Sequence, residues 1–508
     1  MINSEHTAIM LIAVPLLGAF TTAVFGRVSS SLRNIWVLAI LASTELLAVL
    51  LGVNVLEKGI NVYALGASFP TLTSPEGFPV RIILEVDAMN ALISLIACTI
   101  TLIVVVYCLG FMRESRVLDK AYTLILLLLT GMLGLTLTGD LFNLFVFFEV
   151  VSISSAALIA FYVHRGQSLE AAFKYMVISA TGALILLFAV AIIYSQYNLL
   201  SMAALAASIK YTFLDEVALV LLISAFLLKA GSVPAHMWKP DAYGEAPAPV
   251  AVMLLTSALV SLYVLFRITY TVFNPVTPTI GWTLALLGVL SIFLGVSMAL
   301  IQTKLNRLIA YSAIAEIGFI LLGVGSSLTQ SPHTSKVGFN ALSGGLFHIL
   351  NDVLDLGLLF LAAGAIYYLT RENNMNRLGG LGKTHPVLGV FFLIGLLAVS
   401  GLPPFNGFAS KLMIYESVYF FNPLFAIIGI LGSILMAAVY VKAFYSVFLG
   451  VFPPQELGQI PKSMLAAMGV LALLILVIGL YPATVIKYLI TPAADALINP
   501  GDYIGGVL

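Results

Sequence analysis

The regular recurrence of long apolar runs constrains this chain more than any other feature. About 14 runs of membrane-spanning length follow one another along its 508 residues. Because the bilayer core offers no water to hydrogen-bond to, each run must satisfy its own backbone groups, which favours α-helices. The expected spans are residues 7–25, 34–55, 86–111, 121–138, 141–162, 171–195, 215–235, 246–272, 280–302, 307–325, 338–368, 386–417, 423–449 and 463–487.

Composition supports the same class. Since 61% of residues are hydrophobic and only 9% are charged, we predict an all-α polytopic membrane protein and exclude a soluble domain. Equal numbers of basic and acidic residues, 23 of each, give no indication of nucleic-acid binding. Cys98 and Cys108 lie in one apolar run and indicate neither a disulfide framework nor a metal site. The N-terminus lacks the basic region of a signal peptide, so we expect the first run to be a retained helix.

Basic residues divide unequally between the two ends of the predicted spans. The side with fewer receives Lys58, Arg81, Lys210, Lys336 and Lys487. The side with more receives Arg27, Arg33, Arg113, Arg116, Lys120, Arg165, Lys239, Lys304, Arg307, Arg371, Arg377, Lys383 and Lys462. Positive residues accumulate on the cytoplasmic side, so we predict a cell-membrane protein with both termini outside. The long connection at residues 56–85 is expected to form a small exposed hairpin.

Two of the spans are predicted to be broken. In the seventh, Lys229 lies deep in apolar sequence and Pro234 follows five residues later. Proline removes a backbone donor and frees a carbonyl about four residues back, close to Lys229. In the twelfth, Gly401-Leu-Pro-Pro404 interrupts the run before Lys411. A charge near the bilayer centre costs roughly 2.5–3.5 kcal/mol, so we interpret both breaks as parts of an ion pathway.

Titratable residues inside the spans form two series. These are Glu149, Lys174 and Lys229 on spans five to seven, and Glu316, His348 and Lys411 on spans ten to twelve. Matching members are an odd number of spans apart, so the two units would be inverted relative to each other, as in many transporters. The expected organisation is helices 1–3 in residues 1–120, inverted five-helix repeats in 121–272 and 273–450, and a last helix with its tail in 451–508.

Glu149 is the candidate partner of Lys229. A lone carboxylate in so apolar a helix would be protonated, whereas a neighbouring ammonium would keep both groups charged. Separating the two charges would favour release of the lysine proton, which makes the pair a switch. The alternative is a static buried ion pair that fixes helix packing.

His348, Asp352 and Asp355 are spaced i, i+4 and i+7 and share one helix face. The histidine suits a proton relay between the two lysines. A packing network and an oxygen-rich site for Na⁺ are the alternatives, because the pattern lacks the further His or Cys ligands of a transition-metal site.

Four more residues complete the list of candidates. His236 follows the first break, Glu416 follows Lys411, and Lys442 lies in the thirteenth span. Lys442 either ends the proton path or extends its amine to the cytoplasmic face. Arg267, near a predicted helix end, is expected to be an anchor at the membrane interface.

Five stretches carry a recognisable family pattern. They are Pro234-Ala-His-Met-Trp-Lys-Pro-Asp-Ala with Glu245-Ala-Pro, Glu170-Ala-Ala-Phe-Lys-Tyr, Gln302-Thr-Lys-Leu-Asn-Arg-Leu-Ile-Ala-Tyr-Ser, Leu346-Phe-His-Ile-Leu-Asn, and Gly401-Leu-Pro-Pro with Gly407 and Lys411. Together they resemble antiporter-like subunits, which occur in respiratory complex I, in Mrp-type Na⁺/H⁺ antiporters and in archaeal membrane-bound hydrogenases. The resemblance covers nearly the whole chain.

The resemblance implies 14 helices in two inverted repeats, with half-channels joined by a polar axis at mid-membrane. Glu149 would modulate Lys229, the central protonatable lysine. Lys411 would be the terminal lysine, and His348 would lie between the two. The lack of a long amphipathic helix after the last span favours a shorter subunit, like the Mrp D subunit.

Four positions depart from the family pattern. Leu259 and Leu356 stand where many members carry lysines. Asp352 replaces a second histidine, and Glu316 replaces a His or Gln. This axis is therefore poorer in bases and richer in acids, which leaves room for Na⁺ or for water-bridged proton transfer.

The leading hypothesis is a proton-translocating subunit of a larger ion-pumping complex, either a membrane-bound hydrogenase or a complex I-like oxidoreductase. No ligand set for an iron–sulfur, nickel or haem centre is evident, so no cofactor and no catalysis by this chain alone are expected. Its partners would be other membrane subunits, including homologous ones, together with H⁺, lipid and, in one alternative, Na⁺. The alternatives are a component of a stand-alone Mrp antiporter and a structural subunit with a vestigial channel.

Overall fold

The protein is almost entirely helical. The computed structural model describes residues 6–65, 82–112, 118–274, 277–330, 335–450 and 457–507. The helices are α1 (Thr7–Val28), α2 (Ser30–Lys58), α3 (Ala88–Phe111), α4 (Leu118–Leu137), α5 (Leu141–Ile159), α6 (Gly166–Tyr197), α7 (Met202–Ser208), α8 (Phe213–Ala230), α9 (Lys239–Glu245), α10 (Ala248–Arg267), α11 (Thr277–Ile301), α12 (Leu305–Thr329), α13 (Lys336–Thr370), α14 (Leu381–Thr384), α15 (Pro386–Val399), α16 (Asn406–Phe421), α17 (Pro423–Phe444), α18 (Lys462–Leu480), α19 (Pro482–Val485), α20 (Thr491–Ile498) and α21 (Pro500–Val507). Short π-helical turns, η2 (Ile268–Val272), η5 (Tyr445–Leu449) and η6 (Ile486–Ile490), continue α10, α17 and α19, and η4 (Met375–Arg377) is a 3-10 turn.

The predicted all-α membrane fold is confirmed. Among the described residues, 12 helices are long and apolar enough to span a membrane. The shorter α8 lies where the seventh span is expected, and α15 with α16 lies where the twelfth is expected. Both of these spans are broken, as the sequence indicates, while the total of 14 and the inverted repeat stay predictions.

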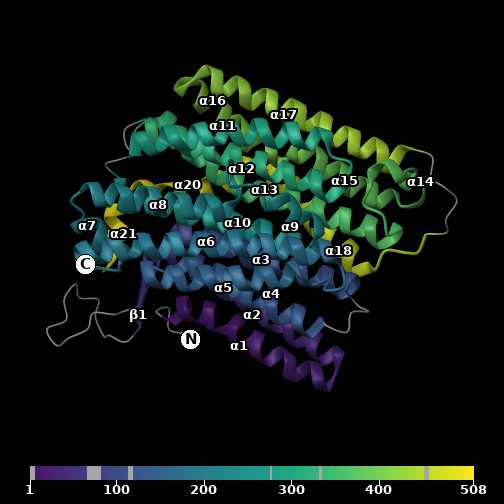
Figure 1. The fold of residues 1–508 in the computed structure, drawn as a ribbon, viewed down its shortest axis with the longest axis horizontal. Coiled ribbons are helices and arrows are strands. Elements are labelled where there is room, and N and C mark those ends of the chain that lie inside the picture. The colour runs from purple at the N-terminus through teal and green to yellow at the C-terminus, as the bar shows by residue number, and fades with distance from the viewer. Residues whose placement is uncertain are drawn as a thin grey trace.

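The helices lie side by side, with α1 and α2 along one edge of the bundle and α16 and α17 along the opposite edge (Figure 1). The most apolar stretch of α10 is 100% buried and those of α12 and α13 are 94% buried, against 39% for α1 and α17. Polar groups on the three central helices therefore have neither lipid nor solvent to contact, and must find partners inside the protein.

Close packing fixes the position of α12. A Cβ added to Gly288 of α11 would lie 2.7 Å from the carbonyl oxygen of Gly318 of α12. Glycine is needed at this contact because the two backbones nearly touch, a packing mode common between membrane helices. The seam holds α12 firmly against α11, and α12 carries Glu316.

The connection after α2 forms a hairpin, as expected for its described part. Strands β1 (Asn61–Leu65) and β2 (Ile82–Val86) are antiparallel, with Tyr63 opposite Leu84. Unlike the expectation of an exposed hairpin, β2 is largely buried. Helix α1 begins and α21 ends at the same end of the bundle (Figure 1), and the cellular side of that end stays a prediction. Of the basic residues used for orientation, Arg81, Arg113 and Arg116 lie outside the described residues.

Arg267 is not an interfacial anchor, contrary to expectation. It is 1% exposed, and its Nη2 lies 2.6 Å from Oδ2 of Asp87 and 3.0 Å from Oδ1 of Asn90. The ring of Tyr503, from α21, covers the guanidinium at 4.6 Å. Glu85 of β2 is also buried, and burial raises the pKa of its carboxyl well above the usual range, against the opposing effect of Arg267. The buried ion pair of Asp87 and Arg267 thus joins the start of α3 to the end of α10, and α21 covers it.

Asp87→Asn should destabilise the protein, because it leaves the Arg267 guanidinium buried without its counter-charge. Removing one partner of a buried ion pair costs about 3–5 kcal/mol, which predicts a clear fall in the melting temperature of the purified chain. The matched control is Glu170→Gln, in the exposed pair with Lys174, where the effect should be ~1 kcal/mol or less. Equal melting temperatures for the two variants would contradict this role of the pair.

Candidate functional site

The first helix break lies between α8 and α9. Helix α8 ends at Ala230, and Gly231 adopts the left-handed conformation (φ 74°) that commonly ends helices. Pro234 also disfavours helical backbone at the residue before it. The expected end at residue 235 is therefore wrong, and Lys229 lies in the last turn of α8 rather than deep within the helix.

Three hydroxyl groups hold Lys229. Lys229 is only 3% exposed. Its Nζ donates to Oγ of Ser152 (2.7 Å), Oγ of Ser179 (2.7 Å) and the hydroxyl of Tyr175 (3.0 Å). An ammonium has three N–H donors, so these acceptors satisfy it completely. The ring of Phe148 lies 4.6 Å from Nζ and adds a cation–π attraction. The site can therefore hold a protonated lysine with no carboxylate in contact.

Glu149 does not contact Lys229. The two residues, both in the described part of the chain, interact electrostatically, and no ion pair joins them. Phe148 and Ser152 are four residues apart on α5 and share the face toward the lysine, whereas Glu149 is rotated about 100° from Phe148. The direct pair expected from the sequence is therefore absent, and Glu149 can influence the lysine only from a distance.

The second break separates α15 from α16. Helix α15 ends at Val399, and Gly401 again has a positive φ of 70°. Lys411, 1% exposed, donates to the carbonyl oxygen of Val399 (2.7 Å) and to Oε1 of Glu316 (3.0 Å). The ring of Phe319 lies 4.3 Å from its Nζ.

Glu316 connects Lys411 to His348. Its Oε2 lies 2.8 Å from Nε2 of His348, while Nδ1 of the same ring lies 3.0 Å from Oγ of Ser410. One buried carboxylate of α12 thus bridges a lysine of α16 and a histidine of α13. The sequence places these three residues in one series, and the fold brings them into contact.

Asp352 and Asp355 continue the inner face of α13 beyond His348, and each is 1% exposed. Among the described residues, neither oxygen of Asp352 has a hydrogen-bond partner, and neither does Oδ1 of Asp355. Buried carboxyl oxygens without a protein donor require a proton, a water molecule or a cation. The two aspartates are therefore suited to take up one of these.

Lys239 is a central residue that the sequence does not reveal. It is expected among the exposed basic residues of the cytoplasmic side, yet it is 0% exposed. Its Nζ donates to the carbonyl oxygen of Ala230 (2.9 Å), lies 5.3 Å from the ring of Tyr243 and interacts electrostatically with Asp352. Two features of the sequence could have found it: its place in the motif that begins at Pro234, and its position just after a helix break, where free carbonyls need donors.

The two breaks are filled in the same way. Ala230 and Val399 are the last residues of α8 and α15, and the carbonyl of each accepts a hydrogen bond from a lysine beyond the break. A cation at a helix C-terminus is favoured by the free carbonyls and by the helix dipole. In this respect the counterpart of Lys411 is Lys239, rather than Lys229 as the two series suggest.

Lys174 and Lys442 lie away from this centre. Lys174 is exposed and pairs with Glu170 (2.7 Å) and Asp241 (3.0 Å) in a cavity of about 330 Å³. The inward face of α6 is taken by Tyr175 and Ser179, which contact Lys229, so Lys174 points elsewhere. Lys442 is exposed, and its Nζ donates to the carbonyl oxygen of Leu300 (2.8 Å).

The two remaining candidates are also separate from the buried cluster. Glu416 is exposed on α16, five residues beyond Lys411. His236 is 7% exposed in the first break, and among the described residues its Nδ1 has no partner. Neither residue contacts the groups around Glu316.

Comparison with known proteins places this geometry in a family. Residues 138–437 match the family model described as NADH:quinone oxidoreductase/Mrp antiporter, TM. The Na(+)/H(+) antiporter subunit A1 of Staphylococcus aureus, in strains N315 and MRSA252, is 30% identical over 450 residues, or 84% of this chain and 56% of the relative. The chain therefore spans about half the length of these curated relatives.

Two solved structures share the whole fold. A chain of the Mrp complex from Dietzia sp. DQ12-45-1b has a TM-score of 0.86 at 24% identity, over 100% of both chains. A chain of the membrane-bound sulfane sulfur reductase (MBS), an archaeal respiratory membrane complex, has a TM-score of 0.84 at 30% identity, over 99% of both chains. The resemblance seen in the motifs is confirmed: the chain belongs to the NADH:quinone oxidoreductase/Mrp antiporter family and is an antiporter-like membrane subunit.

Proposed function

We propose that this chain conducts protons across the membrane as a subunit of a multi-subunit ion-pumping complex. The observation that carries the proposal is a set of six ionisable residues on the central elements, each 3% exposed or less: Lys229, Lys239, Asp352, His348, Glu316 and Lys411. Charged groups near the centre of a membrane are costly. Two of the lysines also hold helix ends, but that role needs neither His348 nor the carboxyl groups of Asp352 and Glu316, whereas a proton path uses groups of all three kinds.

Lys239 is proposed to link the two halves of the path. Its Nζ is bound to the carbonyl oxygen of Ala230, the residue that follows Lys229 in the chain. It also interacts electrostatically with Asp352 of α13. Transfer of a proton from the ammonium to the carboxylate neutralises both groups, so no unpaired charge is left in the protein interior. The proton then has one helical turn to cross to reach His348.

His348 is proposed to pass the proton on. An imidazole can accept a proton at one nitrogen and release one from the other. Its Nε2 contacts Glu316, whose second oxygen contacts Lys411. The three groups therefore form a continuous hydrogen-bonded route to the second helix break.

The cavity around Lys174 is proposed as the entrance to the path. Asp241 pairs there with Lys174 and, at 2.6 Å, with Arg307, and it lies two residues from Lys239 on the short helix α9. This assigns Lys174 to proton uptake rather than to the intramembrane relay. Glu149 would adjust the charge state of Lys229 from a distance.

Na⁺/H⁺ exchange is a second candidate function. The unpartnered oxygens of Asp352 and Asp355 are of the ligand type that Na⁺ takes, and relatives carry the name Na(+)/H(+) antiporter. In either case the energy would come from a partner subunit or from an opposing ion gradient. We propose a redox-driven parent complex, with a stand-alone Mrp antiporter as the alternative. Chains of this fold and length occur in both a respiratory reductase and an Mrp complex, so the fold is compatible with either parent.

Lys239→Gln should reduce proton flux through the assembled complex in proteoliposomes by about 100-fold or more, since it removes a proton carrier while leaving a donor for the Ala230 carbonyl. The matched control is Lys383→Gln, which changes an exposed lysine outside the buried cluster. Assembly, measured by co-purification of the other subunits, should be unchanged in both variants. Equal flux in the two variants would remove Lys239 from the path.

The double variant Asp352→Asn/Asp355→Asn distinguishes the two candidate functions. If the aspartates carry only protons, transport should fall while its dependence on external Na⁺ is the same as in the wild type. If they bind Na⁺, wild-type flux should depend on Na⁺ and the variant should lose that dependence. Flux that is insensitive to Na⁺ in the wild type would contradict the second candidate.

A further inference from the structure

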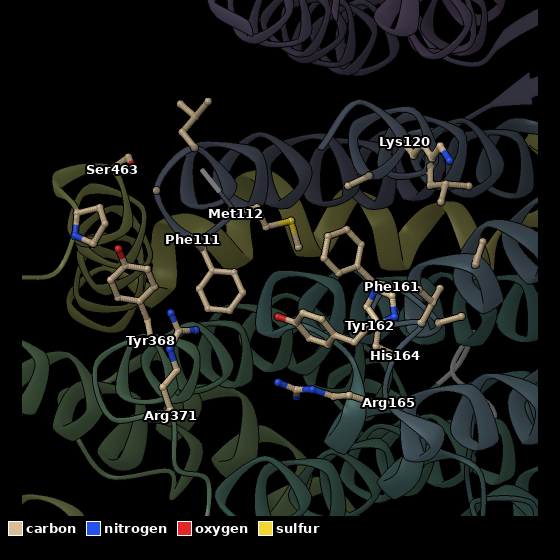
Figure 2. A pocket seen from close by; sticks show the side chains of 18 of the residues that line it. Phe111, Met112, Lys120, Phe161, Tyr162, His164, Arg165, Tyr368, Arg371 and Ser463 are labelled. Atoms are coloured by element: carbon tan, nitrogen blue, oxygen red, sulfur yellow. The ribbon is translucent and has the colours of Figure 1, made fainter. Parts of the chain in front are cut away.

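A large cavity lies at the basic end of the bundle, away from the proton path. It has a volume of about 1110 Å³ and is bordered by the ends of α3, α5 and α13 and by the beginnings of α4 and α18. Figure 2 shows Arg165 and Tyr162 extending into it from one side and Arg371 and Tyr368 from the other, with Phe111 between them. The cavity thus lies where five helices meet one edge of the membrane.

Positive charge predominates in the part of this cavity's lining that the structure describes. Its described lining contains Lys120, Arg165, Arg371 and Lys462, and no aspartate or glutamate. All four cations are exposed, and none forms an ion pair within the described ranges. Arg165 instead lies over the ring of Tyr162 at 4.5 Å. Four unneutralised cations around one space attract an anion.

Much of the remaining lining is apolar. Leu109, Phe111, Leu124, Ala157 and Phe161 belong to this part, and the other polar members are Tyr162, His164, Tyr368 and Ser463. The cavity therefore offers both cations and apolar side chains, which matches an amphiphile better than a small free anion. The volume also exceeds the roughly 300–1,000 Å³ typical of small-molecule sites.

We propose that this cavity binds an anionic phospholipid, with the head group between Arg165 and Arg371 and acyl-chain carbons against the apolar lining. Tyrosine side chains at this level are typical of the membrane interface, and basic pockets between membrane helices bind anionic lipid head groups. The charge asymmetry of the chain assigns this edge to the cytoplasmic leaflet, which is rich in such lipids. The lipid would tie α3 and α5 to α13 and α18. This role is independent of the proposed proton path.

The test measures phosphatidylglycerol and phosphatidylcholine retained by the purified, assembled complex, using native mass spectrometry. Arg165→Gln/Arg371→Gln should reduce phosphatidylglycerol retention about 30-fold, since each Lys or Arg near the membrane surface contributes roughly a factor of five to the attraction. Arg27→Gln/Lys383→Gln, two exposed basic residues outside the cavity, is the matched control and should retain lipid like the wild type. Phosphatidylcholine should be retained poorly by all of them.

Ala157→Trp tests the apolar part while keeping every cation. Ala157 is exposed and lines the cavity, so the indole fills space without disturbing the core. Loss of phosphatidylglycerol from this variant is expected for a lipid site. Undiminished retention in Ala157→Trp, equal retention in the arginine variant and its control, or displacement of the lipid by millimolar inorganic phosphate would each overturn the proposal. If an acidic segment of a partner subunit copurifies in the cavity in place of lipid, the proposal also fails.

Discussion

The structure depends on buried lysine ammonium groups that satisfy the free carbonyls of broken membrane helices. A helix that ends inside a membrane leaves acceptors with no water to bond to, and in this chain Lys239 and Lys411 supply the donors for Ala230 and Val399. The same groups carry charge, so they need counter-charges or aromatic faces nearby. Glu316, Asp352 and the rings of Tyr243 and Phe319 meet that need. The same two lysines therefore determine both how the helices end and where positive charge lies inside the membrane.

This arrangement connects protonation with local structure. A charged ammonium makes stronger hydrogen bonds than a neutral amine. A lysine that gives up its proton therefore weakens its hold on the helix end across the break. The two breaks are related by this shared chemistry, and Glu316 joins one of them to His348. On the proposed path, a proton that leaves Lys239 or Lys411 would weaken the hydrogen bond at that helix break.

Sequence reasoning succeeds where hydrophobic length or motif spacing decides the outcome. The all-α membrane fold, both breaks, the family and the grouping of Glu316, His348 and Lys411 follow from such patterns. It fails where the rotation of a side chain about its helix decides. Glu149 follows Phe148, and Lys174 precedes Tyr175; Phe148 and Tyr175 both contact Lys229. Because successive residues of a helix are rotated by about 100°, Glu149 and Lys174 point elsewhere. Lys239 and Arg267 look like interfacial cations, because nothing in the local sequence shows that Lys239 turns back to the end of α8 or that Tyr503 of α21 covers Arg267.

Proton flux in proteoliposomes that contain the assembled complex with Lys229→Ala tests whether the buried lysines conduct protons. The substitution removes the one amine that Ser152, Ser179 and Tyr175 surround. With Lys58→Ala, an exposed lysine, as the control, flux through the complex that carries the Lys229 variant should fall clearly below that of the control while the complex stays intact. Flux equal to that of the control, in an intact complex, would contradict proton conduction through the buried lysines.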